Sequence, residues 1–219
     1  MASEGLSIYF AGALFNHKDL IGNRILANVL ERISEGRYRC VLPQDLESSV
    51  SRAIDVRNQD LKSVIEADLT LFHFDGTELD SGTIVEFMVA KMLDIPAVVI
   101  RTDFRLSGDQ SKDGDPWNLM CSGYPRTKVI LRNGMKDYQN ASRRSSSEQE
   151  MLNMYLSPVA HLIDRNFIEL LQHPSLFGGD IDKAQMHYDW AIRFPGGGLM
   201  VPSGWTNEIV KRKAQNRLI

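Results

Sequence analysis

A carboxylate without a basic neighbour stands out in this sequence. Glu86 closes the run Asp-Ser-Gly-Thr-Ile-Val-Glu, which begins at Asp80 and has the composition of a helix start. On a helix the side-chain neighbours of Glu86 lie three and four positions away, and none of these four residues is basic. Because an unpaired carboxylate is costly to desolvate, two interpretations stay open. Glu86 is either a structural residue, half exposed or paired with a distant Arg, or a residue with a chemical role.

The start of the same helix offers a second feature. Asp80 and Ser81 are both natural N-cap residues, and capping is the simplest role for one of them. A helix N-terminus at Ser81 and Gly82 could also hold an anion such as phosphate. The pattern matches neither a Walker A motif nor a dinucleotide fingerprint, so it does not identify a nucleotide site by itself.

Two further positions are typical of ligand contacts, and a third is ambiguous. Gly12 and Phe15 follow the first predicted strand, where glycine admits close backbone approach and an aromatic ring can stack on a flat ligand. Asp60 lies on a predicted helix and alone would be taken for a solvated surface charge. The histidines and cysteines show no metal-ligand spacing, and no nucleophile elbow is present in the sequence. We therefore expect no metal and no cofactor.

The elements that must position these residues alternate between strand-like and helix-like patterns. This alternation predicts an α/β fold of the flavodoxin-like, doubly wound kind, with a largely parallel five-stranded sheet and a helical C-terminal extension. The expected strands are 7–10, 39–42, 68–74, 96–101 and 127–131. The expected helices are 19–35, ended by Gly36 as its C-terminal cap, 50–67, and one that contains Glu86 and closes near Asp94.

The rest of the chain consists of a long connection and a C-terminal part. Residues 102–126 contain the apolar stretch Pro116–Met120, which we expect to fold back over another part of the protein. Residues 1–135 are the expected catalytic domain, 136–147 a polar hinge, and 148–219 a helical extension for packing or oligomer contact. Ser147 with Glu150 predicts a capping box, and Pro158 predicts a kink or restart in the helix that follows.

Composition limits the functional classes. The chain has 219 residues, 43% of them hydrophobic, and a formal net charge of −3. This charge disfavours a nucleic-acid polymer or an acidic membrane as partner and makes a small ligand the better expectation. Two distant cysteines, a short polar N-terminus and the lack of an apolar run of about 18 residues predict a cytoplasmic protein.

Four segments of the sequence, in this order, resemble the nucleoside 2-deoxyribosyltransferase family. They are Ile8–Phe15, Asp55–Leu61, Asp80–Glu86 and Asn118–Met120, and they lie within roughly the first 135 residues. The Asp-Ser-Gly-Thr-x-x-Glu block is the most specific of them, and Asn-Leu-Met adds weight by its order and spacing.

The resemblance implies a reaction and its catalytic residues. Glu86 would be the nucleophile that attacks C1′ of a deoxyribonucleoside, and Tyr9 would hold it through a phenol hydrogen bond. Asp60 would protonate the departing base and then deprotonate the incoming one. The implied activity is transfer of 2-deoxyribose between nucleobases with net retention, through a covalent intermediate on Glu86, with deoxynucleosides and free bases as the small-molecule partners.

The resemblance also implies substrate-binding residues. Asp80 would bind the sugar hydroxyls, Asn118 would reach the 5′-hydroxyl, and Phe15 and Met120 would form walls of the base pocket. In this family Asn118 would commonly come from a neighbouring subunit, so we expect a homo-oligomer, a dimer or larger, with shared active sites. Two departures are notable: Ala13 replaces a usual proline, and the chain continues far beyond the usual family end.

Two other functions remain open at this point. A nucleoside 5′-monophosphate N-glycosidase would use the same glutamate for hydrolysis and would need a phosphate pocket, to which Ser81 could contribute. Asn118 is better suited to a neutral hydroxyl than to a phosphate. A non-catalytic nucleoside-binding module is the second alternative, and the combination of Tyr9, Asp60 and Glu86 argues against it.

Overall fold

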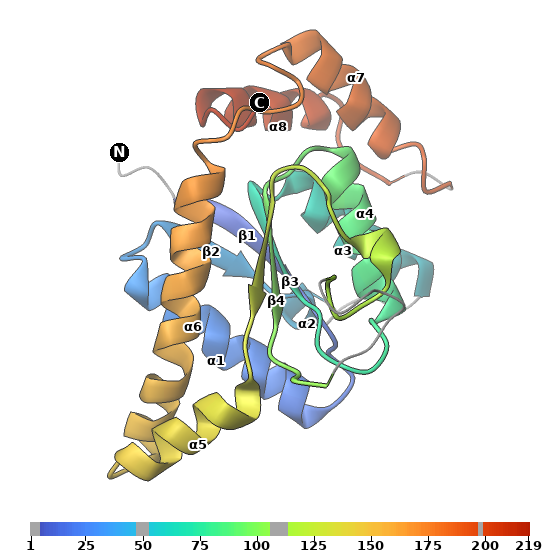
Figure 1. Cartoon of the computed structure of the whole chain (residues 1–219). Coiled ribbons are helices and arrows are strands. Elements are labelled where there is room, and N and C mark those ends of the chain that lie inside the picture. Colours follow the sequence, from blue (N-terminus) through green and yellow to red (C-terminus); the bar gives the residue numbers. More distant parts are fainter. Residues whose placement is uncertain (1–4, 47–52, 106–113, 197–198) are drawn as a thin grey trace.

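The computed structural model describes residues 5–46, 53–105, 114–196 and 199–219. Within these residues, five strands form one parallel sheet in the order β2-β1-β3-β4-β5 (Figure 1). Their bounds are β1 Leu6–Ala11, β2 Tyr38–Val41, β3 Leu69–His73, β4 Ala97–Arg101 and β5 Thr127–Leu131. This is the flavodoxin-like strand order, in which ligands bind at the carboxyl ends of the strands. The expected fold class is confirmed.

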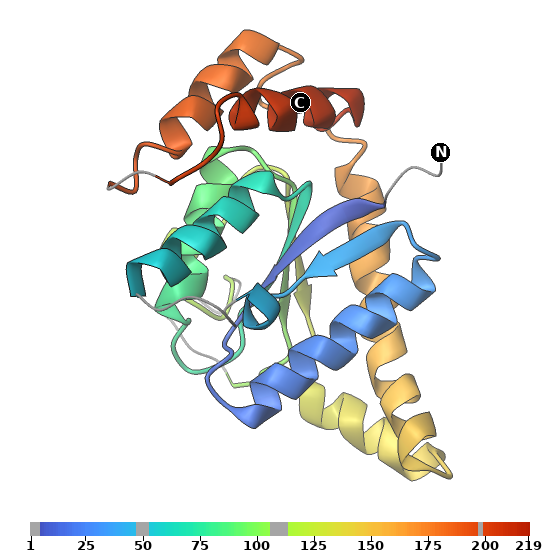
Figure 2. The same cartoon turned by 180° about the vertical axis from the view of Figure 1, so that it is seen from behind.

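Helices cover both faces of the sheet. Their bounds are α1 His17–Ile33, α2 Pro43–Leu46, α3 Ala53–Glu66, α4 Ser81–Met92, the 3₁₀ helix η2 Leu119–Cys121, α5 Gly134–Arg144, α6 Glu148–Leu170, α7 Ile181–Ala191 and α8 Trp205–Gln215. Helices α1 and α6 lie on one face, and α3 and α4 lie on the other (Figures 1 and 2).

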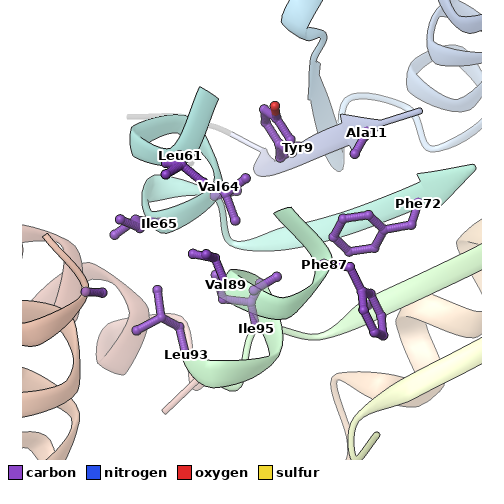
Figure 3. Close-up of a cluster of buried hydrophobic side chains, with 14 of the residues drawn as sticks. Tyr9, Ala11, Leu61, Val64, Ile65, Phe72, Phe87, Val89, Leu93 and Ile95 are labelled. Carbon is purple, nitrogen blue, oxygen red and sulfur yellow. The ribbon is translucent and has the colours of Figure 1, made fainter. Parts of the chain in front are cut away.

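The alternation of side chains along β1 builds a core on each side of the sheet. Ile8 and Phe10 point into the cluster formed with α1 and α6. Tyr9 and Ala11 point into the cluster formed with α3 and α4, where Figure 3 shows Tyr9 in the same group of buried side chains as Phe87. The two-residue period of a strand therefore assigns Tyr9 to the face that carries Glu86.

The observed element ends refine the predicted ones. Helix α1 ends at Ile33 and is capped by Ser34, and the left-handed turn beyond it comprises Glu35 and Gly36 with φ values of 53° and 79°. Gly36 thus ends the turn rather than capping the helix directly. The predicted start of the 50–67 helix falls outside the described residues up to position 52, and the described helix begins at Ala53.

Helix α5 occupies residues 134–144 and thus most of the range 136–147 that was predicted as a polar hinge. Arg143 and Arg144 form its basic last turn, which is favourable beside the negative end of the helix dipole. Helix α6 runs through Pro158 without a restart. Ser147 caps α6 by accepting from the backbone N–H of Glu150, but the Glu150 carboxylate accepts from Ser146 instead of Ser147.

Helix α6 is part of the main core rather than an appended layer. Val159, Ile163 and Phe167 are buried against the sheet together with Leu30 of α1. An open parallel sheet needs both faces covered, and α1 alone does not cover the face that α6 shares. The chain beyond the strands therefore completes the α/β layer structure before it reaches α7 and α8.

Helices α7 and α8 lie at the amino-terminal edge of the sheet (Figures 1 and 2). Arg212 and Lys213 of α8 donate to the carbonyls of Glu66 and Ala67, just before β3 begins. This edge is opposite to the carboxyl ends of the strands, so the C-terminal helices lie away from the start of α4.

A buried ion pair lies at the same amino-terminal edge of the sheet. Arg126, just before β5, lies 2.7 Å from Asp94, and the two side chains are 4% and 3% exposed. Arg126 also donates to the carbonyl of Leu218, and Asp94 accepts from Ser175 and from the backbone N–H of Leu176. The pair therefore links the sheet to the C-terminal part of the chain.

Across the described ranges, none of the helices has both the length and the apolar character required to cross a bilayer.

Candidate active site

A hydrogen bond between two elements defines the centre of the site. The hydroxyl of Tyr9, on β1, donates to Oε1 of Glu86, on α4, at 2.7 Å. Tyr9 is fully buried, and Glu86 is half-buried next to the buried Phe87. A phenol donor to a carboxylate is a charge-assisted bond and fixes the orientation of the acceptor. The partner of Glu86 is therefore a neutral hydroxyl from the sheet.

The environment of Glu86 favours its protonated form more than water does. Burial raises the pKa of Glu86 to about 7, the bond from Tyr9 lowers it, and the charges of Asp60 and Asp80 raise it. Desolvation is the largest of these effects, as expected for a carboxyl group in an apolar surrounding. Near neutral pH, Glu86 thus exchanges between carboxylate and carboxylic acid, which is typical of carboxyl groups in catalytic sites.

Asp80 is the N-cap of α4. Its Oδ2 accepts from the backbone N–H of Thr83 at 2.7 Å and from the Thr83 hydroxyl at 2.9 Å. The capping role predicted for Asp80 or Ser81 therefore belongs to Asp80, whereas Ser81 and Gly82 are exposed in the first turn. Thr83 supports this cap through two bonds, a contribution that the sequence pattern did not reveal.

Asp60 belongs to α3, which packs beside α4 on the same face of the sheet. Its Oδ1 is buried, and its charge acts on Glu86. Since Coulomb effects of this kind weaken with distance, the two carboxyl groups are near neighbours. The structure thus brings together Tyr9, Asp60, Asp80 and Glu86, which the sequence separates by up to 77 positions.

A buried tryptophan anchors the long connection between β4 and β5 next to this site. Trp117 is 2% exposed and packs edge-on against Phe74, with ring centroids 5.3 Å apart. Phe74 in turn packs against Phe87, the residue after Glu86. The prediction that Pro116–Met120 folds back onto the protein holds for Trp117, whereas Leu119 and Met120 are 50% and 67% exposed. The prediction named the whole apolar stretch and did not single out Trp117 as its anchor, although tryptophan has the largest apolar surface of these residues.

The residues predicted to contact the base and the 5′-hydroxyl are exposed to solvent. Asn118 is exposed, and its Oδ1 accepts from the backbone N–H of Met120 at 2.9 Å. Met120 is 67% exposed and Phe15 is 78% exposed. In the single chain these three side chains therefore face solvent, and their predicted roles stay predictions.

Gly12 has a structural reason for its small size. A Cβ atom at this position would lie 3.0 Å from Cβ of His73, which is tighter than ordinary contacts. The close approach at Gly12 is thus between the β1–α1 loop and β3. In the described residues, no group of three or more His, Cys, Asp or Glu side chains is arranged to hold a metal ion.

Comparison with known families assigns the chain to a class of enzymes. The family model described as "Nucleoside 2-deoxyribosyltransferase" matches residues 8–120, more than half of the chain. This range includes Tyr9, Asp60, Asp80 and Glu86. The chain therefore belongs to the nucleoside 2-deoxyribosyltransferase family, and it is an enzyme of that transferase class.

Several solved structures are similar to the chain. A conserved protein from Enterococcus faecalis V583 is 24% identical with a TM-score of 0.49, covering 69% of this chain and 97% of its own. A 2-desoxiribosyltransferase from Leishmania mexicana is 20% identical with a TM-score of 0.45, covering 64% and 98%. A 2-deoxyribosyltransferase from Bacillus psychrosaccharolyticus is 22% identical with a TM-score of 0.39, covering 45% and 74%. No curated protein sequence matches the chain significantly.

Proposed function

We propose that this enzyme transfers 2-deoxyribose between nucleobases by two displacements, through a covalent deoxyribosyl intermediate on Glu86. The observation that carries the proposal is the 2.7 Å bond from Tyr9 to Glu86. It leaves the second carboxylate oxygen of Glu86 available as a nucleophile while the first is held. Carboxylate nucleophiles of this kind divide one difficult displacement into two easier ones.

In the first displacement, the free oxygen of ionised Glu86 forms a bond to C1′ of the deoxynucleoside as the N-glycosidic bond breaks. The bonding electrons leave with the base, and Asp60 donates the proton that the departing nitrogen needs. The developing positive charge on the sugar is stabilised by the neighbouring carboxylate, as in glycoside hydrolysis. The products are a free base and a deoxyribosyl ester of Glu86.

In the second displacement, a ring nitrogen of another base attacks C1′ from the side that the first base left. Asp60, now ionised, accepts the proton of the attacking nitrogen, and the ester oxygen returns to Glu86 as a carboxylate. Two inversions give net retention at C1′. The use of one carboxyl group first as acid and then as base follows from microscopic reversibility.

Substrate contacts are part of the same proposal. Oδ2 of Asp80 accepts both hydrogen bonds from Thr83. Oδ1 of Asp80 accepts no hydrogen bond from the described residues, so this oxygen is available for a sugar hydroxyl. Phe15, Asn118 and Met120 are exposed in one chain and would contact substrate once a second copy covers them. Exclusion of water by that copy would favour transfer to a base over hydrolysis. The active enzyme would then be a homo-oligomer.

The charges at the site favour a nucleoside over its 5′-monophosphate. Asp60, Asp80 and Glu86 form a cluster of carboxyl groups, and a phosphate dianion placed beside them would be repelled. The helix start at Ser81 is already capped by Asp80, which uses the backbone N–H of Thr83. Deoxynucleosides that carry a neutral 5′-hydroxyl are therefore the proposed donors.

An exchange assay tests the function. The enzyme is incubated with 2′-deoxyinosine and adenine, and 2′-deoxyadenosine, hypoxanthine and free deoxyribose are quantified by chromatography. We expect exchanged nucleoside from the wild type, none from Glu86→Ala, and an unchanged rate from Glu208→Ala, an exposed glutamate on α8. If Glu86→Ala keeps its exchange activity, the proposed nucleophile is wrong.

Two additions to the assay separate the remaining possibilities. Replacing 2′-deoxyinosine with its 5′-monophosphate should reduce the rate, whereas a faster release of base and sugar phosphate would identify a hydrolase. Mass spectrometry of enzyme mixed with deoxynucleoside alone should detect a mass gain of one deoxyribosyl group on the peptide that contains Glu86. Tight nucleoside binding without any turnover would instead indicate a non-catalytic module.

A further inference from the structure

A separate cavity lies on the face of the sheet opposite to Tyr9 and Glu86. Its volume is about 370 Å³, and α1, α6 and the ends of β3 and β4 enclose it. Leu26, Ile100 and Val159 line it and belong to the core cluster between the sheet and the α1–α6 layer. Figure 2 shows α1 and α6 over this face. Tyr155, Leu156 and Val159 of α6 line it from outside the range 8–120 that matches the family, and its other lining residues lie within that range.

An exposed glycine on α1 lies at the open side of the cavity. Gly22 is in the interior of α1 and lines the cavity, and a Cβ atom added there would meet nothing within 4 Å. Glycine inside a helix costs about 1 kcal/mol relative to alanine. Packing does not demand this glycine, because an alanine side chain would fit. Its effect is to leave room above the helix surface.

Two polar side chains in the walls have unused hydrogen-bonding capacity. Asn23 is 6% exposed, and its Nδ2 donates to the carbonyl of Ala13 at 3.0 Å. Within the described ranges, Oδ1 of Asn23 and the hydroxyl of Tyr155 have no hydrogen-bond partner. Burial and the charges of Asp75 and Asp137 raise the pKa of Tyr155, so its hydroxyl stays neutral and can donate. One acceptor and one donor are thus fixed in the cavity walls.

The charged residues around the cavity are two carboxylates, Asp19 and Asp75, one lysine, Lys18, and the ionisable His73. Asp75 accepts from the backbone N–H and the hydroxyl of Thr102, both at 2.5 Å, and lies 2.8 Å from Nε2 of His73. Its oxygens are therefore occupied by the protein. Lys18 and Asp19 carry opposite charges at adjacent positions of α1. The cavity thus lacks the excess of positive charge that a phosphate or carboxylate ligand would require.

The geometry points to a binding site for a small uncharged molecule that has an apolar body and a hydrogen-bonding edge. A free nucleobase has both features and serves as the probe. The volume is at the lower end of the range of roughly 300–1,000 Å³ that is typical of ligand pockets. Leu26, Ile100 and Val159 provide the apolar contact, and Asn23 and Tyr155 provide the polar one. This inference does not depend on the reaction proposed above.

Calorimetric titration of the full chain with adenine, hypoxanthine, cytosine and thymine, each in turn, tests the site. We expect the wild type to bind at least one base at a site additional to the proposed catalytic site, and Gly22→Phe to remove this additional site by filling the cavity. Asn28→Phe places the same ring on an exposed position of the same helix and should leave the binding unchanged. Equal binding by the wild type and Gly22→Phe would overturn the inference, as would binding of none of the four bases.

Two further variants assign the binding to one of the two faces. Asp60→Ala alters the proposed catalytic site and should leave binding in the cavity intact. If Asp60→Ala instead loses base binding while Gly22→Phe retains it, the base binds at the catalytic site. Tyr155→Phe removes only a hydroxyl and should weaken binding by about 2- to 10-fold, the value of one hydrogen bond. It decides the question if Gly22→Phe does not fold, because unchanged affinity in Tyr155→Phe would then refute the site.

Discussion

The raised pKa of Glu86 predicts that replacing this residue makes the protein more stable, and increasingly so as pH rises. Glu86 has a pKa of about 7 in the folded protein against an ordinary value of 4.5. The folded state therefore holds a proton that the unfolded chain has already released between these values. Stability consequently falls as pH rises from about 4.5 to 7. Glu86→Gln removes the titrating group and with it this loss.

The size of the effect follows from the same values. A difference of about 2.5 pKa units, at 1.36 kcal/mol each, corresponds to at most ~3 kcal/mol. At pH 4 the wild type and Glu86→Gln should differ only by the constant effect of the amide. At pH 8 the variant should gain up to ~3 kcal/mol relative to that baseline, while transfer activity is lost.

Urea denaturation of both proteins at pH 4, 6 and 8 measures the change. The difference in unfolding free energy between the two proteins cancels the titration of all groups that they share. Glu208→Gln serves as the matched control, since Glu208 is exposed on α8, and it should show no gain with pH. If the difference between wild type and Glu86→Gln is the same at pH 4 and pH 8, the argument from desolvation is refuted.

Three other outcomes are expected. Tyr9→Phe should slow transfer by roughly 10- to 100-fold, because a hydrogen bond to a charged group contributes about 1.5–3 kcal/mol. It should also move the acidic limb of the pH–rate profile to higher pH. An unshifted profile would contradict the Tyr9–Glu86 bond. Trp117→Ala should lower the free energy of unfolding by about 3–5 kcal/mol in denaturation experiments, the usual cost of truncating a buried aromatic residue. A decrease below ~1 kcal/mol would show that Trp117 is not an anchor. Arg126→Met should cost about 3–5 kcal/mol, because it leaves the buried Asp94 carboxylate without its ion-pair partner. Adding Asp94→Asn should recover most of this loss, and no recovery in the double variant would argue against the buried pair.

The sheet could be predicted because its signals are local. Each strand is a short β-branched or apolar run bounded by turn residues, and all five were predicted to within two residues of their observed ends. The segment after Leu131 was less predictable. Residues 136–147 are polar enough to resemble a hinge, yet helix propensity and the cap at Asn133 form α5 there. Periodicity of apolar residues is a weak guide for a helix that buries only Ala141.

The catalytic candidates could be predicted only in part, for a similar reason. Asp80 and Glu86 are six positions apart, and the sequence pattern placed both in the first turns of one helix. The donor to Glu86 is 77 positions away, and sequence reasoning reached it only through the resemblance to a family. Burial of Glu86 depends on the packing of α4 against the sheet. No local pattern contains that information, and the raised pKa could not have been given a value beforehand.

The location of α7 and α8 has a consequence for handling the enzyme. These helices are fastened to the amino-terminal edge of the sheet by Arg212 and Lys213, whereas α4 begins at the opposite edge with Asp80 and Ser81. An attachment to a solid support through a residue engineered on the exposed side of α8 would direct the start of α4 toward the surrounding solution. Substrate would then reach the start of α4 without passing between the protein and the support.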